Sequence, residues 1–160
     1  RSANGRINLI IDPAEWYGQA PLRSPTVFNF FKPNFAQAGE IRAAGLVSPE
    51  YQIATDTLLV YTPNDLGWRI FYFYVGSDYS YAQDPDALLA DYTELKALAG
   101  NSGALVDRLN LVLMSGQMSG FMRTALVTRL NALPMTDGGL ARVQHALFLI
   151  LNSPEYTVQK

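Results

Sequence analysis

Residues 140–151, LARVQHALFLIL, carry the clearest structural signal in this sequence. Their apolar side chains recur every three or four positions, which places them on one face of an α-helix. The predicted face comprises Leu140, Val143, Ala146, Leu147 and Ile150. We expect Thr136 or Asp137 to cap this helix, because a short polar side chain satisfies the free N–H groups at a helix start.

Further helices are predicted upstream of it, each from a capping residue, an apolar repeat and a stop signal. Asp84 predicts the start of a helix that runs to about Ala99. Ser102 and Ser119 are expected to cap the next two helices, the second of which ends before Pro134. The apolar positions of the first two are Leu88, Tyr92, Leu95, Leu105, Leu109, Val112 and Leu113. About four to six helices with short connections make an all-α fold, an irregular bundle or array.

The tetrapeptide Ser-Pro-Glu-Tyr occurs twice, at residues 48–51 and 153–156. Serine is a preferred helix cap, proline suits the first helical position, and glutamate meets the positive end of the helix dipole. Each copy therefore predicts a helix start. The first helix is expected to run to about Tyr61, because Pro63 lacks a backbone donor and clashes with the preceding turn. The second is expected to be a short terminal helix.

Residues 1–47 are expected to form mostly an ordered loop rich in aromatic residues and proline, and residues 48–160 to form helices. One short helical turn is predicted around residues 26–31, with Ser24 as its cap. Residues 68–75 alternate as a strand does, yet no pairing partner lies nearby in the sequence. We therefore favour a helical or irregular structure there.

The composition fits one helical domain over residues 1–160 that has more apolar surface than an isolated domain needs. Hydrophobic residues make up 49% of the chain and charged residues 16%, against about 25% charged residues in typical domains. A chain that packs on the rest of a longer protein or on a partner explains this better than an unusually large core. Because the sequence begins at Arg1 and contains no export signal, we expect a C-terminal fragment left by processing or truncation.

Several classes of function are disfavoured by the composition. The formal charge is −2 and the basic residues are scattered, which argues against a nucleic-acid partner. The longest apolar runs, 7–11 and 146–151, fall short of the roughly 20 residues that span a bilayer. There is no cysteine for a disulfide, a thiolate nucleophile or a zinc site. No phosphate-loop or dinucleotide motif occurs, so no cofactor is implied.

No group of polar residues predicts catalysis or metal binding. His145 is the single histidine and lies opposite the apolar face of its predicted helix, and no serine stands in a Gly-x-Ser-x-Gly elbow. Asp84, Asp86 and Asp91 lack the spacing of a calcium loop. We interpret the histidine as solvated or packed against a helix, and the aspartates as caps.

Four separated blocks resemble the family catalogued as domain of unknown function 1800, and they occur in the family's order. The most specific block is 18–33, GQAPLRSPTVFNFFKP, and the others are 39–53, 105–109 and 142–156. The resemblance implies a longer, largely helical bacterial protein that is exported to the periplasm, the cell envelope or the medium. Members of the family are often encoded beside an exported partner that resembles phosphatases or sulfatases, so the resemblance implies such a partner. It supplies no catalytic residue.

Two functions are consistent with these features. The first is a structural or interaction module of an exported envelope protein, which packs on the rest of its own chain or on a partner. The alternative is a polysaccharide-binding or glycan-processing domain, in which aromatic rings stack on sugars and carboxylates such as Asp12 and Glu15 act on glycosidic bonds. The candidate contact residues for either role are Trp16, Tyr17, Phe28, Asn29, Phe30, Phe31 and Trp68.

Overall fold

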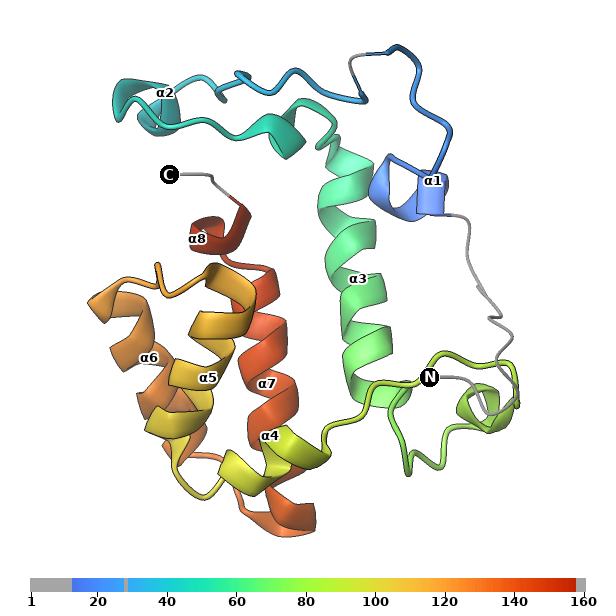
Figure 1. The fold of residues 1–160 in the computed structure, drawn as a ribbon, viewed down its shortest axis with the longest axis vertical. Helices are drawn as coiled ribbons and strands as arrows, with labels where there is room; N and C mark the ends of the chain where they lie inside the picture. The colour runs from blue at the N-terminus through green and yellow to red at the C-terminus, as the bar shows by residue number, and fades with distance from the viewer. Residues whose placement is uncertain (1–12, 28, 158–160) are drawn as a thin grey trace. The chain divides into compact units, whose positions relative to one another are not determined.

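The computed structural model describes residues 13–27 and 29–157, and this part of the chain is all-α (Figure 1). It contains eight α-helices and no β-strand, which confirms the predicted fold class. The α-helices are α1 (Pro13–Tyr17), α2 (Glu40–Ala43), α3 (Asp56–Tyr72), α4 (Thr93–Leu98), α5 (Ser102–Met114), α6 (Gly120–Asn131), α7 (Leu140–Leu151) and α8 (Pro154–Thr157). Three short 3-10 helices accompany them: η1 (Pro49–Gln52), η2 (Ser80–Gln83) and η3 (Thr136–Gly139). None of these described helices combines the length and apolarity needed to cross a membrane.

The described residues divide into two compact units, with the boundary inside α3 after Gly67. The bundle unit is Trp68–Tyr156 and contains α4 to α7. The N-terminal unit covers residues 13–67 together with Thr157, and it contains α1, α2 and the larger part of α3.

The bundle unit is held together by the apolar faces of α5, α6 and α7, with α4 packed against α5 and α7. The predicted face of α7 is confirmed: Val143, Ala146 and Ile150 are completely buried, and Leu140 and Leu147 pack at the edge of the core. The facing core residues on α5 and α6 are Leu105, Val106, Leu109, Met122, Leu126 and Leu130. Each fully buried leucine contributes about 1.5–3 kcal/mol, so this interface dominates the stability of the unit.

The cap predicted for α6 is confirmed, and the cap predicted for α5 is displaced by one residue. Ser119 Oγ accepts a hydrogen bond from the Met122 N–H at 3.0 Å. At α5 the cap is Asn101, whose side-chain oxygen accepts from the Ala104 N–H at 3.1 Å. Ser102 is therefore the first helical residue. Because serine and asparagine cap helices about equally well, the pair Asn101–Ser102 leaves the choice to local geometry.

The predicted cap of α7 is wrong. Gly139, in a left-handed conformation, precedes the helix, and Thr136 and Asp137 lie in the short η3 turn instead. The Asp137 carboxylate forms an ion pair with Lys96 at 2.9 Å. Two successive glycines, at 138 and 139, allow the chain to turn with positive φ before the helix begins.

The helix predicted from Asp84 to Ala99 is correct only in its last part, because α4 begins at Thr93. The Asp84 carboxylate accepts from the N–H of Asp86 at 2.8 Å, a local turn that competes with helix formation. The carboxylate that serves the start of α4 is Asp91, which accepts from the Thr93 N–H at 2.9 Å. Leu88 is consequently exposed and shares no helix face with α4.

The first Ser-Pro-Glu-Tyr forms only the η1 turn, and the prediction that Pro63 ends the next helix is wrong. Helix α3 runs through Pro63 to Tyr72, which also confirms the helical interpretation of residues 68–72. A proline inside a helix costs about 3 kcal/mol. Contacts from α1 on both sides of it offset this cost: Trp16 packs on Tyr61, and Tyr17 binds Asp65.

The second Ser-Pro-Glu-Tyr forms α8, as predicted. Ser153 Oγ accepts from the Tyr156 N–H at 3.2 Å. The Glu155 carboxylate has an additional role, because it accepts from both the N–H and the hydroxyl of Ser119, at 2.8 and 2.5 Å. The terminal helix is therefore tied to the start of α6.

The helical turn predicted around residues 26–31 is absent from the described residues there. Ser24 Oγ donates to the carbonyl of Thr26 at 2.5 Å instead of capping a helix. The Asn29 N–H donates to the same carbonyl at 3.3 Å, and Asn29 has a φ of 84°. A residue with positive φ cannot continue a right-handed helix, so the segment forms a turn.

Candidate functional site

The candidate contact residues fall in both units. Trp16 and Tyr17 lie on α1 of the N-terminal unit, whereas Trp68 belongs to the bundle unit. In the loop after α1, Asn29 is exposed while Phe30 and Phe31 are half-buried. Phe28 lies outside the described residues.

The two aromatic residues of α1 hold this helix against α3. The rings of Trp16 and Tyr61 are 5.0 Å apart. The Thr62 hydroxyl donates to the Trp16 carbonyl at 2.9 Å. The Tyr17 hydroxyl donates to the buried carboxylate of Asp65. Both rings are half-buried, so they contribute to packing within the unit.

A second group of aromatic residues surrounds Trp68 in the bundle unit. Its central ring is Tyr79, whose centroid lies 5.5 Å from that of Trp68, 5.3 Å from Tyr72, 5.6 Å from Phe73 and 5.6 Å from Tyr81. Trp68 also contacts Tyr72 at 5.2 Å. We call these five residues the aromatic cluster. Trp68 and Tyr72 lie in the last part of α3 and Phe73 follows it directly, while Tyr79 precedes η2 and Tyr81 lies within η2.

Three rings of the aromatic cluster are open to solvent. The exposed fractions are 49% for Trp68, 46% for Tyr72 and 59% for Tyr81, while Phe73 is buried beneath. The pKa of Tyr79 is raised, first by removal of its phenol from water and then by the neighbouring phenols of Tyr81 and Tyr72. Three phenol groups therefore lie close together on an aromatic surface.

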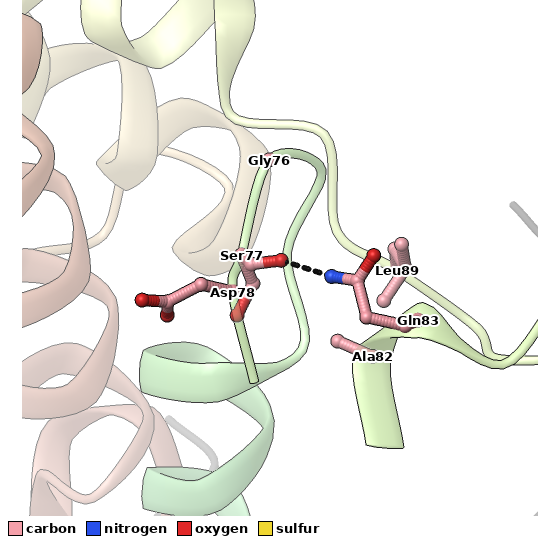
Figure 2. Close-up of a pocket in the computed structure, with 6 residues that line it drawn as sticks. All are labelled: Gly76, Ser77, Asp78, Ala82, Gln83 and Leu89. Carbon is pink, nitrogen blue, oxygen red and sulfur yellow. Dashed lines mark hydrogen bonds between the residues drawn. The ribbon is translucent and has the colours of Figure 1, made fainter. Parts of the chain in front are cut away.

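A shallow pocket of about 550 Å³ adjoins the same segment of the chain (Figure 2). Its lining residues are Gly76, Ser77, Asp78, Ala82, Gln83 and Leu89. The Gln83 side-chain N–H donates to the Ser77 carbonyl across it, while the Asp78 carboxylate points away from Gln83. Ser77 Oγ accepts from the Tyr79 N–H at 3.2 Å, so one loop forms the pocket wall and carries the central ring of the cluster.

The base of this loop is closed by the backbone. Tyr74 and Ala90 form an isolated parallel bridge. The Val75 N–H donates to the Ala90 carbonyl at 2.9 Å, and the Ala90 N–H donates to the Phe73 carbonyl at 3.0 Å. The two ends of the loop that carries Tyr79 and Tyr81 are therefore held together by backbone hydrogen bonds.

The carbonyl of Ile70, near the end of α3, is also satisfied inside the bundle unit. The Tyr92 hydroxyl donates to it at 3.1 Å, and the Gln144 side chain donates to it at 3.0 Å. Burial, with a smaller effect of the neighbouring Tyr74, raises the pKa of Tyr92 to about 12. These contacts fix the part of α3 that carries Trp68 and Tyr72.

The polar candidates do not assemble a catalytic or metal centre in the described part of the chain. His145 packs edge-on against Phe71 at 5.4 Å, and burial, followed by the charge of Arg129, lowers its pKa. No group of three His, Asp or Glu residues suited to a metal ion occurs among the described residues. Glu15 is exposed on α1, and Asp12 lies outside the described residues.

Comparison with known proteins identifies no relative: no family model, no curated protein and no solved structure matches this chain.

Sequence reasoning selected Trp68 but missed Tyr72, Tyr79 and Tyr81. The available signal was density, because seven of the fourteen residues at positions 68–81 are aromatic. Spacing did not reveal the cluster, because its rings come from a helix and a loop, and the periodicity of neither element predicts contact with the other.

Proposed function

We propose that this chain is an interaction module whose N-terminal unit packs against another polypeptide. The observation that carries the proposal is the near absence of fully buried apolar side chains among the described residues of that unit. Among its described residues, Ala20 and Pro49 are buried, but no valine, leucine, isoleucine or aromatic side chain is. Hydrophobic burial is the main favourable term in folding, so a unit without it depends on contacts from elsewhere.

The apolar side chains needed for such contacts lie on its surface. Leu59 and Val60 of α3 are 59% and 56% exposed. The opposite side of the same helix already packs, because Leu58 meets Gly18 and Asp65 binds Tyr17. Leu22 and Val27, in the loop after α1, are almost fully exposed. A contiguous exposed apolar patch typically marks a contact with another protein, and Leu59 and Val60 are neighbours on α3.

The resemblance to domain of unknown function 1800 supports placing this module in an exported protein of the bacterial envelope. The covering polypeptide is then another part of the same longer protein or a second envelope protein. Either source offers the same chemistry to α3, an apolar protein surface that excludes water from Leu59 and Val60.

A site-specific cross-linker tests whether another polypeptide covers this surface, and it identifies that polypeptide as part of the same longer protein or as a second protein. The photoreactive residue p-benzoylphenylalanine replaces Val60 in the protein as its own cells make it, and the matched control carries it at Glu40, an exposed polar position of α2. We expect Val60 to cross-link to a peptide outside the 160 residues, identified by mass spectrometry, and Glu40 to give much less product. Cross-links confined to the 160 residues, or equal yields at both positions, would overturn the proposal.

A further inference from the structure

We propose that the aromatic cluster of the bundle unit is a binding site for a neutral carbohydrate. The site uses Trp68, Tyr72, Tyr79 and Tyr81 of the bundle unit, whereas the polypeptide surface proposed above belongs to the N-terminal unit. The inference rests on three observations: exposed rings whose phenol groups make no hydrogen bond to other described residues, a loop closed by backbone hydrogen bonds, and a charge that is unfavourable for other ligands.

The exposed surface of the cluster combines apolar ring surfaces, tilted by 42–64° to one another, with hydroxyl groups. The phenol oxygens of Tyr72, Tyr79 and Tyr81 make no hydrogen bond to other described residues. A phenol hydroxyl both donates and accepts, and its ring offers a large apolar contact at small entropic cost. A sugar presents the matching arrangement, with C–H groups on the faces of its ring and hydroxyls around the edge.

The site is built before a ligand arrives. Tyr79 contacts the buried ring of Phe73 at 5.6 Å and supports the three open rings around it. The bridge between Tyr74 and Ala90 closes the loop that carries Tyr79 and Tyr81. Side chains that are already held in place lose little entropy on binding, so a few contacts are enough to hold a ligand.

The adjoining pocket adds a polar contact for the same ligand. The side-chain N–H of Gln83 donates to the Ser77 carbonyl, and the amide oxygen of Gln83 makes no hydrogen bond to other described residues. It is therefore available to accept from a ligand hydroxyl. A pocket of about 550 Å³ lies within the range of small-molecule sites, about 300–1,000 Å³, and admits one or two sugar rings beside the cluster.

The charge of the segment disfavours other ligands. Residues 68–91 contain one arginine, four aspartates and neither lysine nor glutamate. Binding to an anionic membrane or to nucleic acid requires clustered lysine and arginine. The four aspartates would also repel an acidic polysaccharide. A neutral sugar chain has no such cost, and hydroxyl groups suit the exposed phenols.

The test is a fluorescence titration that reports on Trp68 alone. The chain has two tryptophans, so the reporter protein carries Trp16→Phe. The probes are cellohexaose, maltohexaose and chitohexaose, with polygalacturonate as the acidic comparison. We expect at least one neutral hexasaccharide to change the emission of Trp68 saturably, and polygalacturonate to bind more weakly. Removal of one ring by Tyr81→Ala should weaken binding by about tenfold, and Tyr81→Phe should weaken it less.

Tyr156→Ala is the matched control, because Tyr156 is a 41% exposed tyrosine outside the cluster, and it should bind like the parent. Circular dichroism shows that each variant keeps its helices. Failure of all three neutral probes, or an equal loss in Tyr81→Ala and Tyr156→Ala, would overturn the proposal. Tighter binding to vesicles of phosphatidylcholine and phosphatidylglycerol than to any sugar, lost in Tyr81→Ala, would also overturn it in favour of a membrane surface.

Discussion

The bundle unit and the N-terminal unit are held together by different kinds of contact. In the bundle unit, residues spaced at helical intervals on α5, α6 and α7 meet in a continuous core with Leu105, Leu130 and Ile150 at its centre. The N-terminal unit has turns, ring contacts and polar bonds such as that from Tyr17 to Asp65, while none of its larger apolar side chains is fully buried among the described residues. The contrast teaches that helical periodicity builds a buried core in one unit, whereas the contacts of the other define its turns without fully burying a large apolar side chain among its described residues.

The largest expected effect compares one leucine from each unit. Leu130→Ala removes a completely buried side chain from α6 and should cost about 3 kcal/mol, within the 2–5 kcal/mol usual for such cavities. Leu59→Ala, at an exposed position of α3, should change stability by less than about 0.5 kcal/mol. Urea denaturation followed by circular dichroism measures both. Similar losses would show that the N-terminal unit has a core of its own.

A pair of glycines gives the next effect. A side-chain carbon at Gly139 would lie 2.6 Å from the Ala99 side chain, and its φ is 77°. Gly139→Ala should therefore cost about 2–3 kcal/mol through steric overlap and backbone strain. Gly45 has a φ of 68° but nothing within 4 Å of that carbon, so Gly45→Ala should cost about 1 kcal/mol. Thermal unfolding ranks the two, and an equal loss would contradict the tight contact at Gly139.

A smaller effect separates two serines that the sequence presents as caps. Ser119→Ala removes the cap of α6 and the contact with Glu155, so it should cost about 1 kcal/mol. Ser24 is exposed and bonds only within a turn, so Ser24→Ala should stay within about 0.5 kcal/mol of the parent. Chemical denaturation of both variants provides the measurement. A larger loss from Ser24→Ala would place a structural cap in the N-terminal unit.

The smallest effect is the dependence of stability on pH that comes from His145. The folded pKa of this base is below its usual 6.5, first because of burial and then because of Arg129. The unfolded chain therefore binds a proton more readily, and stability falls as the pH drops from about 6.5 through the folded pKa. His145→Gln should flatten this slope.

Proton NMR resolves the single histidine directly, since no other imidazole occurs in the sequence. A folded titration midpoint at or above 6.5 would contradict the packing of His145 against Phe71. Because this histidine belongs to the bundle unit, the slope also reports which unit limits the stability.

The sequence predicted the bundle unit well, because its helices follow their own apolar periodicity. The face of α7 and the cap Ser119 are confirmed. Failures have two causes, a contact between distant residues that overrides local preference and a local turn that competes with a helix start. Pro63 stays inside α3 because α1 packs there, and Asp84 closes a turn in place of a helix start.

The two proposed sites follow the same division. The sequence drew attention to Trp16, Tyr17 and Trp68, and it suggested excess apolar surface. It did not show that two of these rings pack on α3 while the third joins Tyr72, Tyr79 and Tyr81. A contact between a helix and a loop has no repeat in the sequence, so only the folded chain reveals it.

The bridge between Tyr74 and Ala90 has a consequence for the local stability of the loop that it closes. Both backbone hydrogen bonds involve residues at the two ends of the loop, so separating the ends exposes the amides of Val75 and Ala90 together. Hydrogen exchange at these two amides should then report one shared free energy of opening. Tyr79 and Tyr81 lie between the two ends, so that free energy also measures how firmly the closed loop holds them.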